Sequence, residues 1–185
     1  NKSKSGGVGG QMFACTSLVN SSLGEQIEWT KIDTTAESNL KISIYKKLPK
    51  VLNRFIRFLY YIVFFKYDHI LIFSSNGLSF LEKGSMAVIA KKITKAKIIF
   101  APRSGRLLNE INSKRIKFIK KVFKSSDKVI CQGASWRNVF LEKVNSDKEK
   151  YVVQKNWIQV EDYSLNENKD NDIVKILFLA WLDKD

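Results

Sequence analysis

Small, amide and arginine side chains recur in this sequence directly after four short apolar runs. The groups are Ser74, Ser75, Asn76 and Gly77 after HILIF; Arg103, Ser104, Gly105 and Arg106 after KIIFA; Gln132, Gly133 and Ala134 after KVIC; and Asn156 and Trp157 after YVV. If these runs are parallel strands, the groups meet at the carboxyl edge of one sheet, where α/β proteins bind ligands. Amides bond hydroxyl groups and arginine pairs with phosphate oxygens, so the composition favours a sugar or phosphate ligand.

A glycine-rich loop precedes the first predicted helix, which covers 11–21. The loop contains Gly6, Gly7, Val8, Gly9 and Gly10. Its backbone N–H groups, at the start of a helix, are suited to an anion. The dinucleotide pattern G-x-G-x-x-G fails because Met12 holds the third glycine position, and no Gly-Lys-Ser/Thr completes a P-loop. A flexible terminus is the alternative, but the apolar stripe of the following helix favours the anion site.

Residues typical of metal or nucleophilic sites are scarce. His69 is the only histidine and begins an apolar run, where a structural role is commoner than acid–base chemistry. Cys15 and Cys131 are far apart and lack C-x-x-C spacing, so we expect two buried, reduced, structural thiols and no metal site. Trp136 is expected in the core rather than beneath a sugar ring.

Helical and strand periods alternate along the chain. Strands are predicted at 26–33, 69–73, 97–101, 128–131 and 151–153. Helices are predicted at 80–93, 113–124 and 135–144, together with one that runs to about 65. Pro49 is placed in the first turn of that last helix, and Ser113 is placed as the N-cap of the helix at 113–124. This alternation predicts an α/β fold with a doubly wound, Rossmann-like parallel sheet.

Two composition shifts suggest how the chain is divided. The polar stretch NENKDND at 166–172 is typical of a linker, and KILFLAWL after it restarts a strand. We therefore expect one domain over 1–165 and the first strand of a second domain within 173–185. Only five residues precede Gly6, so we expect the first strand of the sheet to be missing and the chain to be a fragment.

The formal charge of +14 comes from two segments. Residues 41–66 carry seven bases and no acid, and residues 103–128 carry nine bases and two acids, so each segment contributes +7. The basic positions assigned to helices are Lys46, Lys47, Lys50, Arg54, Arg57, Lys117, Lys120, Lys121 and Lys124. These faces suit an anionic membrane surface or simply water. The longest apolar run, 58–65, is too short to span a bilayer.

Six motifs together resemble a known family. They are GGVGGQ at 6–11, SSNGLSFLEKG at 74–84, APRSGR at 101–106, SDKVICQGASWRNVF at 126–140, KNWI at 155–158 and KILFLAWL at 175–182. In order and spacing, the chain resembles the amino-terminal half of the family 4 (group 1) glycosyltransferases, which have the two-domain GT-B fold. The resemblance covers nearly the whole chain, and DKVICQGASW and LFLAWL are its most specific parts.

This resemblance implies sugar transfer from a nucleotide-sugar donor to a glycan or lipid-linked acceptor in surface polysaccharide biosynthesis. Transfer would retain the anomeric configuration, without a metal or other cofactor, in a protein of the cytoplasm or the inner membrane face. The amino-terminal domain of such enzymes mainly binds the acceptor. By the same match, the glycine loop would lie against the donor diphosphate, and Arg103, Ser104 and Gly105 would face the cleft.

The chain departs from the family in two respects. Many relatives carry a histidine near the end of the strand that matches HILIF, where this chain has Phe73-Ser74-Ser75. The family's carboxy-terminal E-x7-E pair is absent before Asp185. We therefore assign no catalytic residue and expect this chain alone to be inactive.

Other function classes remain open from the sequence. A basic nucleic-acid-binding domain is the main alternative, although no helix-turn-helix, zinc-finger or RNP motif supports a specific nucleic acid. An NAD-dependent Rossmann enzyme is opposed by Met12. An inactive binding module is the third.

Overall fold

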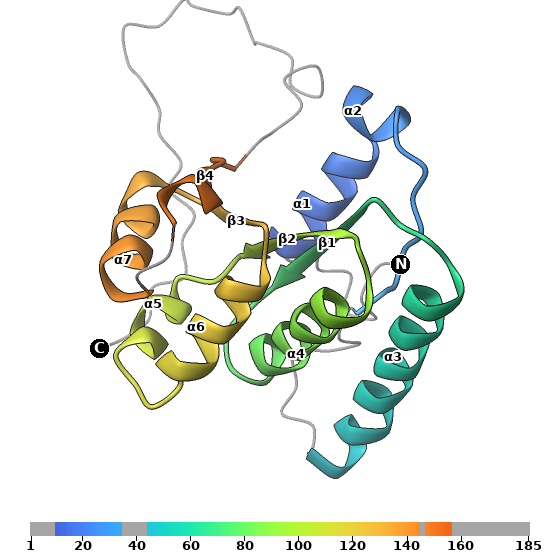
Figure 1. The fold of residues 1–185 in the computed structure, drawn as a ribbon, viewed down its shortest axis with the longest axis horizontal. Coiled ribbons are helices and arrows are strands. Elements are labelled where there is room, and N and C mark those ends of the chain that lie inside the picture. The colour runs from blue at the N-terminus through green and yellow to red at the C-terminus, as the bar shows by residue number, and fades with distance from the viewer. Residues whose placement is uncertain (1–9, 35–43, 145–146, 157–185) are drawn as a thin grey trace, which may run out of the picture.

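The computed structural model describes residues 10–34, 44–144 and 147–156 (Figure 1). Its helices are α1 (Gly10–Val19), α2 (Ser22–Glu25), α3 (Ile44–Phe64), α4 (Leu78–Ile93), α5 (Arg106–Ile111), α6 (Ile116–Ser125), α7 (Ala134–Val144) and the 3₁₀ turn η1 (Lys148–Lys150). Its strands are β1 (His69–Ser74), β2 (Lys97–Pro102), β3 (Lys128–Cys131) and β4 (Tyr151–Val153). The predicted linker at 166–172 and the predicted strand that follows lie outside the described residues.

The four strands form one parallel sheet in the order β1-β2-β3-β4. The longest pairing runs from His69 beside Lys97 to Ser74 beside Pro102. Helices connect consecutive strands, so the predicted α/β class with a Rossmann-like parallel sheet is confirmed. Among the described strands, the order in the sheet follows the order in the sequence. The reversal of order that marks the switch point of a doubly wound sheet is therefore not found among them.

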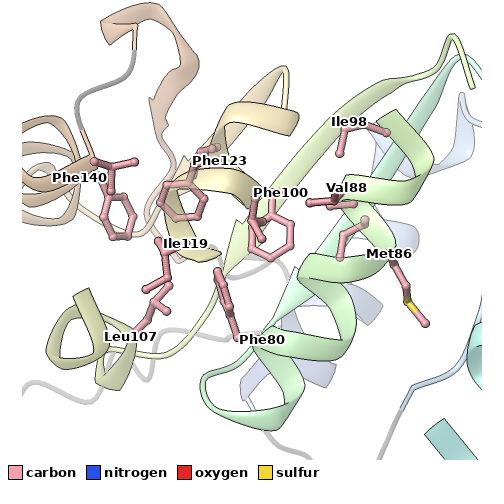
Figure 2. Packing of buried hydrophobic residues seen from close by; sticks show 14 of the residues in the cluster. Phe80, Met86, Val88, Ile98, Phe100, Leu107, Ile119, Phe123 and Phe140 are labelled. Carbon is pink, nitrogen blue, oxygen red and sulfur yellow. The ribbon is translucent and has the colours of Figure 1, made fainter. Parts of the chain in front are cut away.

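Alternate strand residues pack beneath a layer of helices. Phe100 of β2 lies beside the rings of Phe80 on α4 and Phe123 on α6, and Figure 2 shows this cluster at close range. The Phe123 ring of α6 occupies the centre: its centroid is 4.9 Å from that of Phe140 on α7 and 6.2 Å from that of Phe100. Phe80 of α4 meets Phe100 edge to face at 5.5 Å. Such ring pairs stabilise the core beyond their buried area.

The helices of this layer lie side by side in the order α3, α4, α6 (Figure 1). Gly84 permits the close approach of α6, because a Cβ at this position would lie 2.7 Å from Val122 Cγ2. On the other side of α4, Arg54 of α3 donates two hydrogen bonds to the Glu82 carboxylate, at 2.7 and 2.9 Å. Close packing on one side and this ion pair on the other therefore hold α4 against α6 and α3.

Three local predictions are wrong. Residues 26–33 pair with no strand of the described sheet, and a strand without a hydrogen-bonded neighbour is not stable; the Trp29 indole donates instead to the Gly24 carbonyl at 2.9 Å. Helix α3 begins at Ile44, so Pro49 lies inside it rather than in its first turn. The N-cap of α6 is Arg115 rather than Ser113.

The Ser113 error has a clear physical cause. The helices predicted from the sequence do not include α5, which ends at Ile111. The Ser113 hydroxyl donates to the Glu110 carbonyl at 2.6 Å and accepts the Arg115 N–H at 3.2 Å. Its hydrogen bonds therefore close the turn between α5 and α6.

Candidate functional site

The loops after β1 and β2 meet at the side chain of Asn76. The Asn76 Oδ1 accepts hydrogen bonds from Ser104 Oγ at 3.0 Å and from Ser75 Oγ at 3.2 Å. The backbone ties the same loops together, because the Arg103 N–H donates to the Ser74 carbonyl at 2.7 Å. The structure thus brings Ser74, Ser75 and Asn76 after β1 together with Arg103 and Ser104 after β2.

A second amide, Asn156, joins the loops after β2, β3 and β4. Its Oδ1 accepts from Arg103 Nη2 at 2.9 Å and from Gln132 Nε2 at 3.1 Å. The Arg103 guanidinium carbon lies 6.0 Å from the centre of the Phe73 ring, within cation–π range. These contacts hold Arg103 across the carboxyl edge of the sheet.

Both networks orient an amide in the same way. Each uses the amide oxygen as a double acceptor, and the nitrogens of Asn76 and Asn156 donate to none of the described residues. Two N–H₂ groups and a guanidinium are therefore gathered on one edge. Such a donor-rich surface suits a ligand with many acceptor oxygens, such as a sugar or a phosphate.

The carboxylate of Glu110 lies near this edge, and both of its oxygens already have partners. Its Oε1 accepts the Gly77 N–H at 2.9 Å, and its Oε2 lies 3.2 Å from Arg115 Nη1. Gly77 has φ of 63°, a left-handed conformation that favours glycine, at the start of α4. Because both oxygens of Glu110 serve the fold, this carboxylate is poorly suited to act as a general base.

Lys83 is the main residue that the sequence reading overlooked. Its side chain is buried in α4, and Nζ donates to Ser79 Oγ at 3.0 Å. Burial lowers the pKa of the Lys83 ammonium, while the neighbouring Glu82 carboxylate opposes this shift. A sequence signal did exist: Lys83 lies three residues after Phe80 and four before Ala87, on the core face of α4.

Cys15 of α1 lies within electrostatic range of Arg103 and Lys83. Burial raises the pKa of the Cys15 thiol, and the charges of Arg103 and Lys83 act in the opposite direction. Since the net direction is upward, Cys15 is not an activated nucleophile. Both cysteines are free thiols; Cys131 is buried, as predicted, whereas Cys15 is only half-buried.

The remaining predicted site residues lie outside the hydrogen-bond networks of Asn76 and Asn156 or outside the described residues. Gly105 and Arg106 are exposed at the start of α5, and Gly133 precedes α7, with its carbonyl accepting the Arg137 N–H at 3.3 Å. Gly10 begins α1. Gly6, Gly7, Val8, Gly9 and Trp157 lie outside the described residues.

Two predicted structural residues have different outcomes. Trp136 packs against the core, as expected, with its ring 6.1 Å from that of Phe140. His69 is exposed at the start of β1 rather than buried. Because the site lies at the opposite end of the strands, His69 is too remote to act in it.

The basic residues predicted for a membrane surface are divided by the fold. Lys50 and Arg57 of α3 are exposed, whereas Arg54 is paired with Glu82. Lys117, Lys120, Lys121 and Lys124 are all exposed on α6. The side chains of Lys46 and Lys47 are outside the description. No helix among the described residues is long and apolar enough to cross a bilayer, and no described group of His, Cys, Asp or Glu could hold a metal.

No protein-family model, curated protein or solved structure matches this chain. Membership of a family is therefore not shown. The sequence motifs and the donor-rich carboxyl edge of the sheet, with Asn76, Arg103 and Asn156, are the observations that bear on function.

Proposed function

We propose that the chain is the acceptor-side domain of a nucleotide-sugar-dependent glycosyltransferase, corresponding to the first half of a GT-B architecture. The observation that carries this proposal is the convergence of Arg103 with the amides of Asn76 and Asn156 at the carboxyl edge of the sheet. Sugars and their diphosphates are rich in acceptor oxygens, which these donors fit.

Each donor has a distinct role in this proposal. The Asn76 and Asn156 amide nitrogens donate to hydroxyl oxygens of the glycan. Arg103 pairs with a phosphate oxygen of the donor or of a lipid-linked acceptor. During transfer, the bond between the anomeric carbon and the diphosphate breaks and the acceptor hydroxyl oxygen bonds to that carbon. The acceptor hydroxyl gives its proton to the leaving diphosphate, which departs with the bonding electrons. The described residues bind and orient the reactants; a second domain would complete the site.

Ligand-observed NMR tests this binding directly. Saturation-transfer spectra would be recorded with the full 185-residue chain against nucleotide-hexoses, neutral oligosaccharides and duplex DNA. We expect saturation-transfer signals from one of the sugar classes. Arg103→Gln should lower the affinity for that sugar about tenfold, which is the effect of losing a charged hydrogen bond. The matched control is Lys92→Gln, which removes an exposed charge near the end of α4. Binding of no sugar class, or equal binding by Arg103→Gln, contradicts the proposal.

Nucleic-acid binding is a second candidate, favoured by one observation. Four lysines of α6 form an exposed basic face, and phosphate backbones bind such faces. Tight, salt-sensitive DNA binding that is lost in Lys120→Gln/Lys121→Gln, with no sugar signal, would support this candidate in place of sugar transfer.

A further inference from the structure

Helix α3 has apolar side chains on two neighbouring faces. Its inner face packs on the core through Phe55, Phe58, Leu59 and Ile62. Its outer face keeps six large apolar side chains between 52 and 71% exposed: Leu48, Leu52, Ile56, Tyr60, Val63 and Phe64. Contiguous exposed apolar surface of this kind marks an interaction site.

The outer face forms a continuous stripe. Leu48, Leu52, Ile56 and Tyr60 follow one another at four-residue spacing, and Phe64 continues the row. The sixteen steps from Leu48 to Phe64, at a rise of 1.5 Å each, give a stripe roughly 24 Å long. Near its carboxyl end, Ile56, Leu59, Tyr60, Val63 and Phe64 form a shallow, open apolar surface, and the Tyr60 and Phe64 rings lie 5.1 Å apart.

The charges beside the stripe indicate its partner. Lys50 and Arg57 are exposed on α3, and residues 41–66 contain no acidic side chain. A second copy of the chain would bring two bodies of +14 together with their basic helices facing, which is electrostatically unfavourable. An anionic lipid surface offers both an apolar layer and negative headgroups.

We propose that α3 docks on an anionic bilayer, lying in the plane of the interface with its outer face at the headgroup–acyl boundary. The phenol of Tyr60 suits this depth, because its ring is apolar and its hydroxyl is polar. The lysines of α6 lie on the far side of α4, and the apolar face of α6 is buried in the core, so these lysines add long-range attraction without insertion. This docking does not depend on the proposed sugar transfer.

Vesicle co-sedimentation of the full chain tests the docking. The probes are vesicles of phosphatidylcholine alone and of equal parts of phosphatidylcholine and phosphatidylglycerol, at low and high salt. We expect binding to the anionic vesicles only, weakened by salt. Val63→Ser/Phe64→Ser should lower the partition coefficient at least about tenfold, and Arg57→Gln about fivefold.

The matched control is Leu78→Ser/Ile93→Ser, which removes two apolar side chains of α4 that are also more than half exposed. It should bind like the wild type, and circular dichroism should show all variants folded. Equal binding to both kinds of vesicle at low salt, no binding, or wild-type binding by Val63→Ser/Phe64→Ser overturns the proposal. A dimer in sedimentation velocity that this double variant abolishes would assign the stripe to a second copy.

Discussion

The Nη2 atom of Arg103 donates a 2.9 Å hydrogen bond to Oδ1 of Asn156, 53 residues further along the chain. One residue follows β2 and the other follows β4, yet β3 lies between these strands in the sheet. The contact therefore bridges the carboxyl edge above β3, where Gln132 also reaches Asn156. It gives the sheet edge a single connected set of donors, which is the basis of the proposed function.

Asp127 should make stability depend on pH. Burial would raise the pKa of its carboxyl, but hydrogen bonds from Lys91 Nζ and the Ile98 N–H, with the charges of Lys91 and Lys97, hold it below the ordinary value. A lower pKa in the folded state stabilises the fold above the unfolded pKa of about 3.9, and this stabilisation disappears as the pH falls through the folded value.

Urea unfolding of Asp127→Asn against the wild type measures this effect. We expect the variant to be less stable by up to about 1 kcal/mol at neutral pH, because solvent screens this partly exposed ion pair, with a smaller difference below about pH 4. Glu142→Gln, at an exposed carboxylate that is 2.8 Å from Lys143, is the control and should change little. A difference that is constant with pH would contradict the assigned role.

Gly84→Ala should destabilise the protein by overpacking the α4–α6 contact. The new methyl would lie 2.7 Å from Val122 Cγ2 and 3.0 Å from Phe118 Cε1. We expect a loss of about 1–3 kcal/mol in the free energy of unfolding, despite the better helix propensity of alanine. Gly133→Ala is the control, because its added Cβ would meet only Ser135 Oγ at 3.9 Å. Equal effects of the two substitutions on urea unfolding would show that α4 and α6 are not closely packed.

Cys131 should resist alkylation in the folded protein. Burial raises the pKa of its thiol to about 12. At pH 8 this leaves about one thiolate in ten thousand, whereas an ordinary cysteine with pKa of about 8.5 is partly ionised. Mass spectrometry after iodoacetamide treatment should find Cys131 unmodified without urea and modified with it. Rapid modification of the folded protein would contradict its burial.

Lys83→Met should raise stability. The substitution removes a charge whose burial lowers its pKa and keeps a flexible side chain of similar length. We expect a gain on the order of 1 kcal/mol in urea unfolding. Lys92→Met, at an exposed position of the same helix, should be neutral. A loss of stability in Lys83→Met would show that the ammonium is a net structural contact.

The sequence predicted elements with strong local signals. Short apolar runs marked all four strands, and the lysine and isoleucine faces of α6 appeared at helical spacing. Residues 26–33 show the limit of this reasoning, because their alternation is compatible with a strand whereas strand formation depends on a distant partner. The apolar positions of α3 likewise predicted a helix without revealing that half of them face outward.

The site shows the same division. Chain order alone predicted that the residues after the strands would meet, and Arg103, Ser104, Asn76, Gln132 and Asn156 do so. Burial of Lys83 and its electrostatic coupling to Cys15 depend on how α1 and α4 lie, which no local pattern specifies. Catalytic residues stay unassigned, because the described edge presents donors and its carboxylate Glu110 is engaged.

The most direct test is a backbone amide NMR titration of the full chain with a nucleotide-hexose and with a neutral oligosaccharide. We predict that at least one of these ligands shifts the amides of 74–77, 103–105 and 132, and that Arg103→Gln removes these shifts while Lys92→Gln keeps them. Shifts confined to α6 or α3, identical shifts in Arg103→Gln, or no shifts with either ligand would contradict a sugar-binding site at the carboxyl edge.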